Sequence, residues 1–155
     1  MNLYAIMIFM KIGIDVFGCQ HGQSGAGSYI RSLVKNLPCD NDCTYDLFGP
    51  EIDRYTFDSG GKQISYSGFN IGDNLPAKKL WHTVHYHSVV AKKKYDAILF
   101  PAGLPVVSPK HSIPSVVVIH DILSDVFQSY SGSLAVLLRK RQLKHCSKII
   151  AASQF

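Results

Sequence analysis

Cysteine is scarce in this 155-residue sequence and follows no spacing typical of metal binding. The four cysteines (Cys19, Cys39, Cys43 and Cys146) are scattered along the chain. Cys39 and Cys43 are four residues apart, but no second pair stands at the distance found in zinc ribbons. This pattern argues against a metal site and indicates reduced thiols, as in a cytoplasmic protein.

Long apolar runs are absent as well. The first nine residues, MNLYAIMIF, are apolar but fall far short of the ~20 residues that a membrane-spanning helix needs. They also lack the basic start and the small-residue cleavage site of a signal peptide. Met10 is a candidate native start, which makes residues 1–9 an extra leader and residues 10–155 the domain. No later stretch is long and apolar enough to cross a membrane.

Charge is sparse, because Asp, Glu, Lys and Arg together make up 17% of the chain, whereas hydrophobic residues make up 46%. This balance excludes a disordered chain and supports a packed core in one domain. The formal net charge of +5 favours anionic partners such as nucleotides, phospholipid headgroups or nucleic acid. Nucleic acid is not expected, because the sequence shows no recognition helix and no basic stripe with interleaved aromatic residues.

The opening of the domain, residues 10–37, is its most informative stretch. An apolar strand-like run at residues 12–17 leads into a loop with Gly22, Gly25 and Gly27, and apolar residues then recur at helical spacing from Tyr29 to Leu37. A strand that feeds a glycine loop and a helix leaves unpaired N–H groups at the helix N-terminus. Such a place suits an anion, most often a phosphate.

The rest of the chain alternates strands and helices. Strands are expected at residues 45–48 (ended by Gly49 and Pro50), 62–67, 97–100, 115–119 and 149–152, and helices at 76–94 and 133–146. Helix 76–94 is expected to bury a stripe of Leu80, Val84, His87 and Ala91. The run VVVI at 116–119 shows no polar alternation, as expected for a strand covered on both faces. This order predicts an α/β fold with a doubly wound, mostly parallel, Rossmann-like sheet.

In such sheets ligands bind beyond the carboxyl ends of the strands, so the residues after each strand are the site candidates. They are Asp15, the glycine loop, His120, Asp121 and Ser153. Each has a structural alternative: His120 can be a core histidine, Asp15 and Asp121 can cap helices or bond loops, and the glycines can serve only a tight turn. His82, His85 and His87 are expected on the surface or in a groove, without a metal.

Two nucleotide motifs fail on the loop. A Rossmann fingerprint needs a third small residue where Ile30 stands, and a P-loop needs a lysine where Ser28 stands. What remains is a loop compatible with phosphate but without a dedicated lysine.

Three segments taken in order are more specific than the loop: GAGSYIRSL at 25–33, PSVVVIHDIL at 114–123 and KIIAASQF at 148–155. Together they resemble the N-terminal domain of glycosyltransferase group 1, also called family 4. These are retaining enzymes of the GT-B fold that use nucleotide-sugar donors. The order of segments matches across nearly all of residues 10–155, whereas residues 40–75 carry no family motif.

The resemblance implies roles for particular residues. The family loop, usually G-G-[IA]-G-R-[YH], approaches the donor pyrophosphate, which assigns Gly25, Ala26 and Gly27 to substrate binding. Here Ser24 replaces the first glycine and Ser28 a frequent arginine, which weakens the expected phosphate contact.

The family histidine at the end of an apolar strand faces the transferred sugar and corresponds to His120, the expected catalytic residue. Asp15, Asp121 and Ser153 are expected to bind substrate. No E-x7-E motif is present, so the donor-binding C-terminal domain is absent and the chain is expected to be an acceptor-side half, a fragment or a truncated reading frame.

The expected reaction moves a sugar from a nucleotide-diphosphate-sugar to a hydroxyl of a sugar, lipid-linked or protein acceptor, as in cell-surface polysaccharide or glycolipid synthesis. No cofactor or metal is expected. The protein is expected in the cytoplasm. Trp81 near Lys78 and Lys79 suggests a helix that lies on the inner face of the membrane. Ordinary packing of this helix against the sheet is the alternative. A non-catalytic nucleotide- or phosphosugar-binding module is the alternative function.

Overall fold

The computed structural model describes residues 9–38, 42–57, 63–102, 113–120, 141 and 143–151. Within them lies a six-stranded sheet in the order β3-β2-β1-β4-β5-β6, and every neighbouring pair of strands is parallel. The strands are β1 (Met10–Asp15), β2 (Cys43–Pro50), β3 (Ile64–Phe69), β4 (Ala97–Phe100), β5 (Ser115–Ile119) and β6 (Lys148–Ala151). The predicted α/β, doubly wound, Rossmann-like sheet is confirmed.

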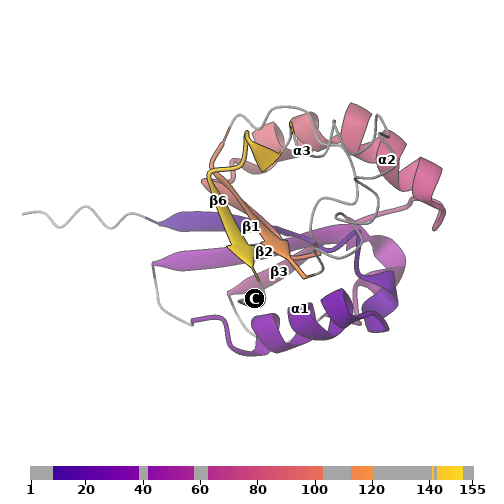
Figure 1. Cartoon of the computed structure of the whole chain (residues 1–155), viewed down its shortest axis with the longest axis horizontal. Coiled ribbons are helices and arrows are strands. Elements are labelled where there is room, and N and C mark those ends of the chain that lie inside the picture. The colour runs from indigo at the N-terminus through magenta and orange to yellow at the C-terminus, as the bar shows by residue number, and fades with distance from the viewer. Residues whose placement is uncertain are drawn as a thin grey trace, which may run out of the picture.

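Helices cover both faces of this sheet (Figure 1). The helical elements are η1 (Gln20–Gly22), α1 (Gly25–Lys35), η2 (Glu51–Asp53), α2 (Leu75–Val84) and α3 (Tyr86–Lys93). On one face α1 packs Ile30 and Val34 into a cluster with Ile14 and Leu47 of the central strands. The opposite face carries α2 and α3, so the molecule has three layers.

The layer of α2 and α3 is rich in aromatic side chains. Trp81, Tyr86 and Phe48 belong to one buried cluster, and the Trp81 ring centroid lies 4.4 Å from that of Phe17 and 4.7 Å from that of Phe69. Trp81 is 6% exposed, so it packs against the sheet and is not a membrane-facing residue. Burial of these large rings is the main apolar contribution to this layer.

The single helix expected at residues 76–94 is two helices that meet at His85. The expected stripe is also wrong, because Leu80 and Val84 are 64% and 57% exposed and Ala91 is exposed. The inward positions are Trp81, His82, Tyr86 and Val90. His82, Tyr86 and Val90 are four residues apart, so they form one helical stripe that continues across His85 and is two residues out of phase with the expected one.

The ends of β1, β2, β3 and β6 differ from the predicted ones by one or two residues, and the difference at β2 is the most informative. Gly49 and Pro50 were expected to end the second strand, but β2 continues through both, since Gly49 pairs with Gly68 and Pro50 with Phe69. The expected helix at 133–146 lies largely outside the described residues. No helix within the described ranges is long and apolar enough to cross a membrane.

The chain order locates the place where ligands bind in folds of this class. From β1 the chain builds outward through β2 and β3, and it then returns to the other side of β1 to build β4, β5 and β6. The order therefore reverses between β1 and β4. In doubly wound sheets the crevice beyond the carboxyl ends of two such strands is the ligand site.

Candidate functional site

Asp15, the last residue of β1, is bound on both carboxylate oxygens. The N–H of Phe17 donates to Oδ1 at 2.9 Å, and the Nε2 of His82 donates to Oδ2 at 2.7 Å. His82 comes from α2, and its side chain is 3% exposed, against 7% for Asp15. Asp15 therefore bonds the backbone of its own loop, as the structural alternative expected. Its carboxylate points into the layer of α2.

His82 donates through both ring nitrogens. Its Nδ1 lies 2.9 Å from the carbonyl oxygen of Lys78 and its Nε2 faces the Asp15 carboxylate, and neither partner can donate a hydrogen bond in return. Burial lowers the pKa of His82, but the Asp15 charge and the hydrogen bonds outweigh it and raise the pKa above 6.5. The arrangement holds a buried imidazolium–carboxylate pair at the end of β1.

The glycine loop opens α1. Ser24 is the N-cap, and its Oγ accepts from the N–H of Gly27 at 3.0 Å and donates to the Cys19 carbonyl at 3.1 Å. Gly27 is buried, and a Cβ on it would lie 2.5 Å from the Cα of Gly22. A Cβ on Gly25 would meet nothing within 4 Å. Gly27 therefore serves close backbone packing, whereas Gly25 faces open space.

His120 follows β5 and joins two of the strand ends to α1. Its Nε2 donates to the carbonyl oxygen of Pro101, directly after β4, at 2.5 Å. Its ring meets the ring of Tyr29 edge to face, with 4.9 Å between centroids. His120 is exposed and is therefore not the core histidine that was the structural alternative. With the proton on Nε2, the Nδ1 of a neutral ring is an acceptor.

Between β1 and α1 the backbone makes a left-handed turn. Gln20, His21 and Gly22 have φ values of 44°, 54° and 78°, a region that non-glycine residues adopt at an energetic cost. The His21 ring bridges two carboxylates: Nδ1 is 2.6 Å from Asp53 Oδ1 and Nε2 is 2.9 Å from Asp73 Oδ2. The bonds to Asp73 and then to Asp53 raise the pKa of His21 above 6.5.

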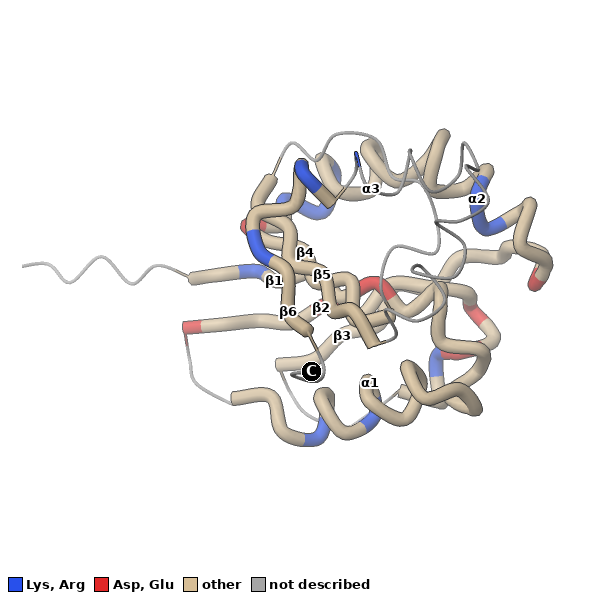
Figure 2. Tube along the Cα trace, in the orientation of Figure 1, with Lys and Arg blue, Asp and Glu red and all other residues tan. Residues whose placement is uncertain are grey.

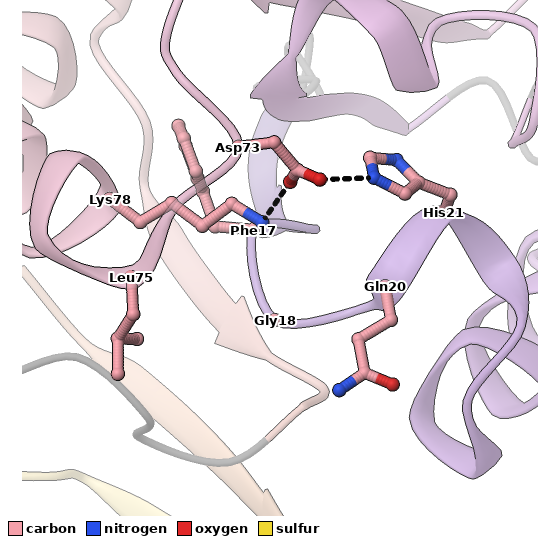
Figure 3. A pocket seen from close by; sticks show the side chains of 7 residues that line it. All are labelled: Phe17, Gly18, Gln20, His21, Asp73, Leu75 and Lys78. Atoms are coloured by element: carbon pink, nitrogen blue, oxygen red, sulfur yellow. Dashed lines mark hydrogen bonds and ion pairs between the residues drawn. The ribbon is translucent and has the colours of Figure 1, made fainter.

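A pocket of about 380 Å3 opens beside this turn, at the edge where β1 ends. The Lys78 amine and the His21 ring approach the Asp73 carboxylate from two sides, and the side chains of Leu75 and Gln20 flank the opening (Figure 3). Lys78 Nζ lies 2.6 Å from Asp73 Oδ1. Lys78 and then His21 lower the pKa of Asp73 to about 2. The lining is Phe17, Gly18, Gln20, His21, Asp73, Leu75 and Lys78.

Acidic residues lie at the carboxyl ends of the first three strands: Asp15 ends β1, Asp53 lies in η2 after β2, and Asp73 lies in the loop after β3. Figure 2 shows acidic segments of the backbone in red at this edge. Asp15 pairs with His82, whereas Asp53 and Asp73 share His21. Among the residues that the structure describes, no group of three His, Cys, Asp or Glu side chains could hold a metal ion. Burial raises the pKa of the Cys19 thiol far above its usual range, which makes this cysteine unreactive.

The structure brings some of the predicted site residues together and separates others. His120 lies against α1 through Tyr29, the helix that begins with Gly25, Ala26 and Gly27. Asp15 faces α2 on the other side of the sheet. Asp121 and Ser153 lie outside the described residues.

Five side chains at this edge were not predicted as site residues: His21, Asp53, Asp73, Lys78 and His82. His82 was expected on the surface or in a groove, but it is 2% exposed. The available signal was weak, because a histidine next to a tryptophan on a helix does not reveal a carboxylate 67 residues earlier. His21 stands between a glutamine and a glycine in a loop, where periodicity carries no information.

No family model matches the sequence, and no curated protein matches it either. Among solved structures, the fold resembles a glucose-6-phosphate dehydrogenase in complex with its substrate glucose-6-phosphate, with 12% sequence identity and a TM-score of 0.46. The match covers 96% of this chain and 37% of the dehydrogenase chain.

Proposed function

We propose that this chain is the acceptor-side half of a retaining glycosyltransferase that moves a sugar from a nucleotide-diphosphate donor to an acceptor hydroxyl. The observation that carries the proposal is the meeting of α1 and His120 at the carboxyl edge of the sheet. Tyr29, one turn into α1, contacts the His120 ring, and His120 also bonds the residue after β4. This edge includes the point where the strand order reverses.

The N-terminus of α1 is the proposed contact for the donor pyrophosphate. The first helical N–H groups have no acceptor within the helix, and the helix dipole favours an anion there. Ser24 occupies the N–H of Gly27, so Gly25 and Ala26 are the residues that offer N–H groups. The open space at Gly25 lets a phosphate oxygen approach the backbone.

His120 is the proposed catalytic residue. Its Nε2 is occupied by the Pro101 carbonyl, so Nδ1 is the nitrogen that accepts a hydrogen bond from a sugar hydroxyl. The Pro101 bond and the Tyr29 ring hold the imidazole in place before the substrate arrives. Positioning of this kind, with electrostatic stabilisation of the leaving phosphate, is a large part of catalysis in group transfer.

The pocket beside η1 is the proposed acceptor side. Asp73 and Gln20 can accept hydrogen bonds from hydroxyl groups, and Lys78 can donate them, while Leu75 offers an apolar wall. This mixture suits a sugar, whether free, lipid-linked or attached to protein. The exposed Leu80 and Val84 of α2 are the residues available for a peripheral contact with a lipid surface.

The test is a titration of the chain with UDP and GDP at millimolar concentration, followed by amide NMR. We expect shift changes at Gly25, Ala26 and Tyr29 and at the His120 ring. As a control, a Gly25→Val variant should fold but lose these shift changes, because its side chain fills the open space beside the Gly25 backbone. Changes confined to other segments would overturn the proposal.

Turnover then separates the proposal from the alternative of a binding module. The protein that carries this domain is incubated with nucleotide-diphosphate sugars and simple glycoside acceptors, and product is followed by mass spectrometry. Transfer with retention at the anomeric carbon supports the proposal. Binding of nucleotides at α1 with no transfer to any acceptor favours the binding module.

A further inference from the structure

His21 holds three loops together at one edge of the sheet. It lies in η1, which follows β1, and it bonds Asp53 in η2, which follows β2, and Asp73 in the loop after β3. These strands are neighbours, so the three loops leave the sheet side by side. Among the described residues, no other histidine ring bonds carboxylates of two different loops.

This bridge needs a protonated ring. A neutral imidazole has one N–H donor and one lone pair, whereas a carboxylate only accepts. In the neutral form one of the two nitrogens therefore turns a lone pair toward a carboxylate. Asp53 is more sensitive than Asp73 to loss of the proton from His21. Its side chain is 4% exposed, so water cannot easily replace the hydrogen bond from the imidazolium.

The charged groups around the ring come from four elements. They are Asp53 of η2, Asp73 before α2, Lys78 of α2, which bonds the far oxygen of Asp73, and Arg31 of α1, whose Nη2 donates to the Gly22 carbonyl at 2.7 Å. The two carboxylates are the groups that touch the ring. Their combined charge favours the imidazolium.

This bridge is one of the contacts that hold the left-handed turn, and the bond from Arg31 to the Gly22 carbonyl is another. Gln20 and His21 both have positive φ without the freedom of glycine, so contacts outside the turn must hold them there. The backbone of Gly22 is the surface against which Gly27 packs, and the Ser24 hydroxyl bonds the Cys19 carbonyl next to the turn. The position of the α1 N-terminus is therefore set by the conformation of η1.

We propose that His21 is a pH-sensitive latch: its imidazolium bridges Asp53 and Asp73, fixes the left-handed turn of η1, and thereby positions the N-terminus of α1. Loss of the proton releases the turn and loosens the first turn of α1. His21 is a positioning residue, because it acts on a ligand through the backbone from Gly22 to Gly27. Only the consequence for a bound phosphate depends on the proposed function.

The test follows each histidine ring and the backbone amides of the chain by NMR between pH 6 and pH 9. The ring of His21 should titrate above its ordinary pKa of 6.5, and the amides of Gly22, Gln23 and Gly27 should move with the same midpoint. A His21→Gln variant should lose this titration of the amides. His87→Gln, a change on α3 far along the chain from η1, should behave like the unmodified chain.

Asp73→Asn keeps the measurement decisive if His21→Gln fails to fold. An asparagine can donate to the ring, so a neutral His21 keeps both of its hydrogen bonds. In this variant the ring should titrate lower, and the amides of η1 should stay unchanged at pH 9. Amides of η1 that do not move while the His21 ring titrates, or a ring midpoint at or below 6.5, would overturn the latch.

These measurements need no substrate, so the latch and the proposed function can fail separately. Where transfer activity is found, its pH profile gives the second readout. Activity should fall at alkaline pH with the midpoint of the His21 titration. His21→Gln should remove this fall, whereas His87→Gln should keep it. Transfer that is absent altogether contradicts the proposed function and leaves the NMR result to decide on the latch.

Discussion

The carboxylate of Asp15 and the imidazole of His82 meet at 2.7 Å although 67 residues separate them in the chain. The pair joins the end of the central strand β1 to α2, and both side chains are shielded from solvent. The Phe17 ring meets the His82 ring edge to face, with 4.7 Å between centroids. An ion pair in such surroundings is sensitive to the loss of one partner, because the other charge is then left buried and unmatched.

Asp15→Asn should therefore lower the free energy of unfolding by about 3 kcal/mol, the usual effect of removing one partner from a buried pair. Urea denaturation at pH 6 measures the change. His85→Gln is the matched control, because His85 is exposed at the junction of α2 and α3, and its effect should stay within about 0.5 kcal/mol.

The same pair gives a pH dependence with a definite sign. The folded-state pKa of His82 is raised above 6.5, so the stability that the pair contributes is fully present below pH 6.5 and is lost as the pH rises through the folded-state pKa. In a plot of the free energy of unfolding against pH, Asp15→Asn should remove the loss of stability that comes from His82. The loss that comes from deprotonation of His21 should remain. Curves for the two proteins that run parallel from pH 6 to pH 9 would contradict the assignment.

Two glycines of the same loop should respond in different ways to an added methyl group. Gly27→Ala places a Cβ against the backbone of η1 and should destabilise the chain by about 1–3 kcal/mol, whereas Gly25→Ala should stay within about 0.5 kcal/mol. Thermal unfolding compares the two variants directly. Equal melting temperatures would show that η1 moves away from Gly27 without resistance.

His120→Ala tests the proposed catalytic role in the protein that carries this domain. We expect kcat/KM to fall about 100-fold, or ~2.7 kcal/mol of transition-state stabilisation, because the variant loses the Nδ1 acceptor. The melting temperature should change by only a few degrees, since the ring is exposed and leaves little cavity. A large loss of stability with unchanged activity per folded molecule would make His120 a structural residue.

The chain alone should transfer no sugar and should bind nucleotide sugars no more tightly than about 1 mM, which corresponds to roughly −4 kcal/mol. Its α1 N-terminus and His120 form only one side of the proposed site. Isothermal calorimetry and a product assay check both statements. Micromolar affinity or turnover by the chain would contradict them.

The fold class could be predicted from the sequence because it depends on local patterns. The unbroken apolar run of β5 requires cover on both faces, and helices on both sides of a parallel sheet supply that cover. The start of α1 is equally local, since Ser24 caps the helix and Gly22 has positive φ in the turn before it. His120 was selected in the same way, as the residue after a buried strand, and its role stays a prediction.

The partners of the site residues were decided by the tertiary structure. Nothing near Asp15 in the sequence indicates His82, and nothing near His21 indicates Asp53 or Asp73, because each partner belongs to a different strand–loop unit. The strand order brings these units to one edge, and burial of Asp15, His82 and Asp53 then makes each of these charges require a counterion. Local propensity determined which strands and helices form, whereas long-range pairing of charges and packing of aromatic rings determined which side chains became buried.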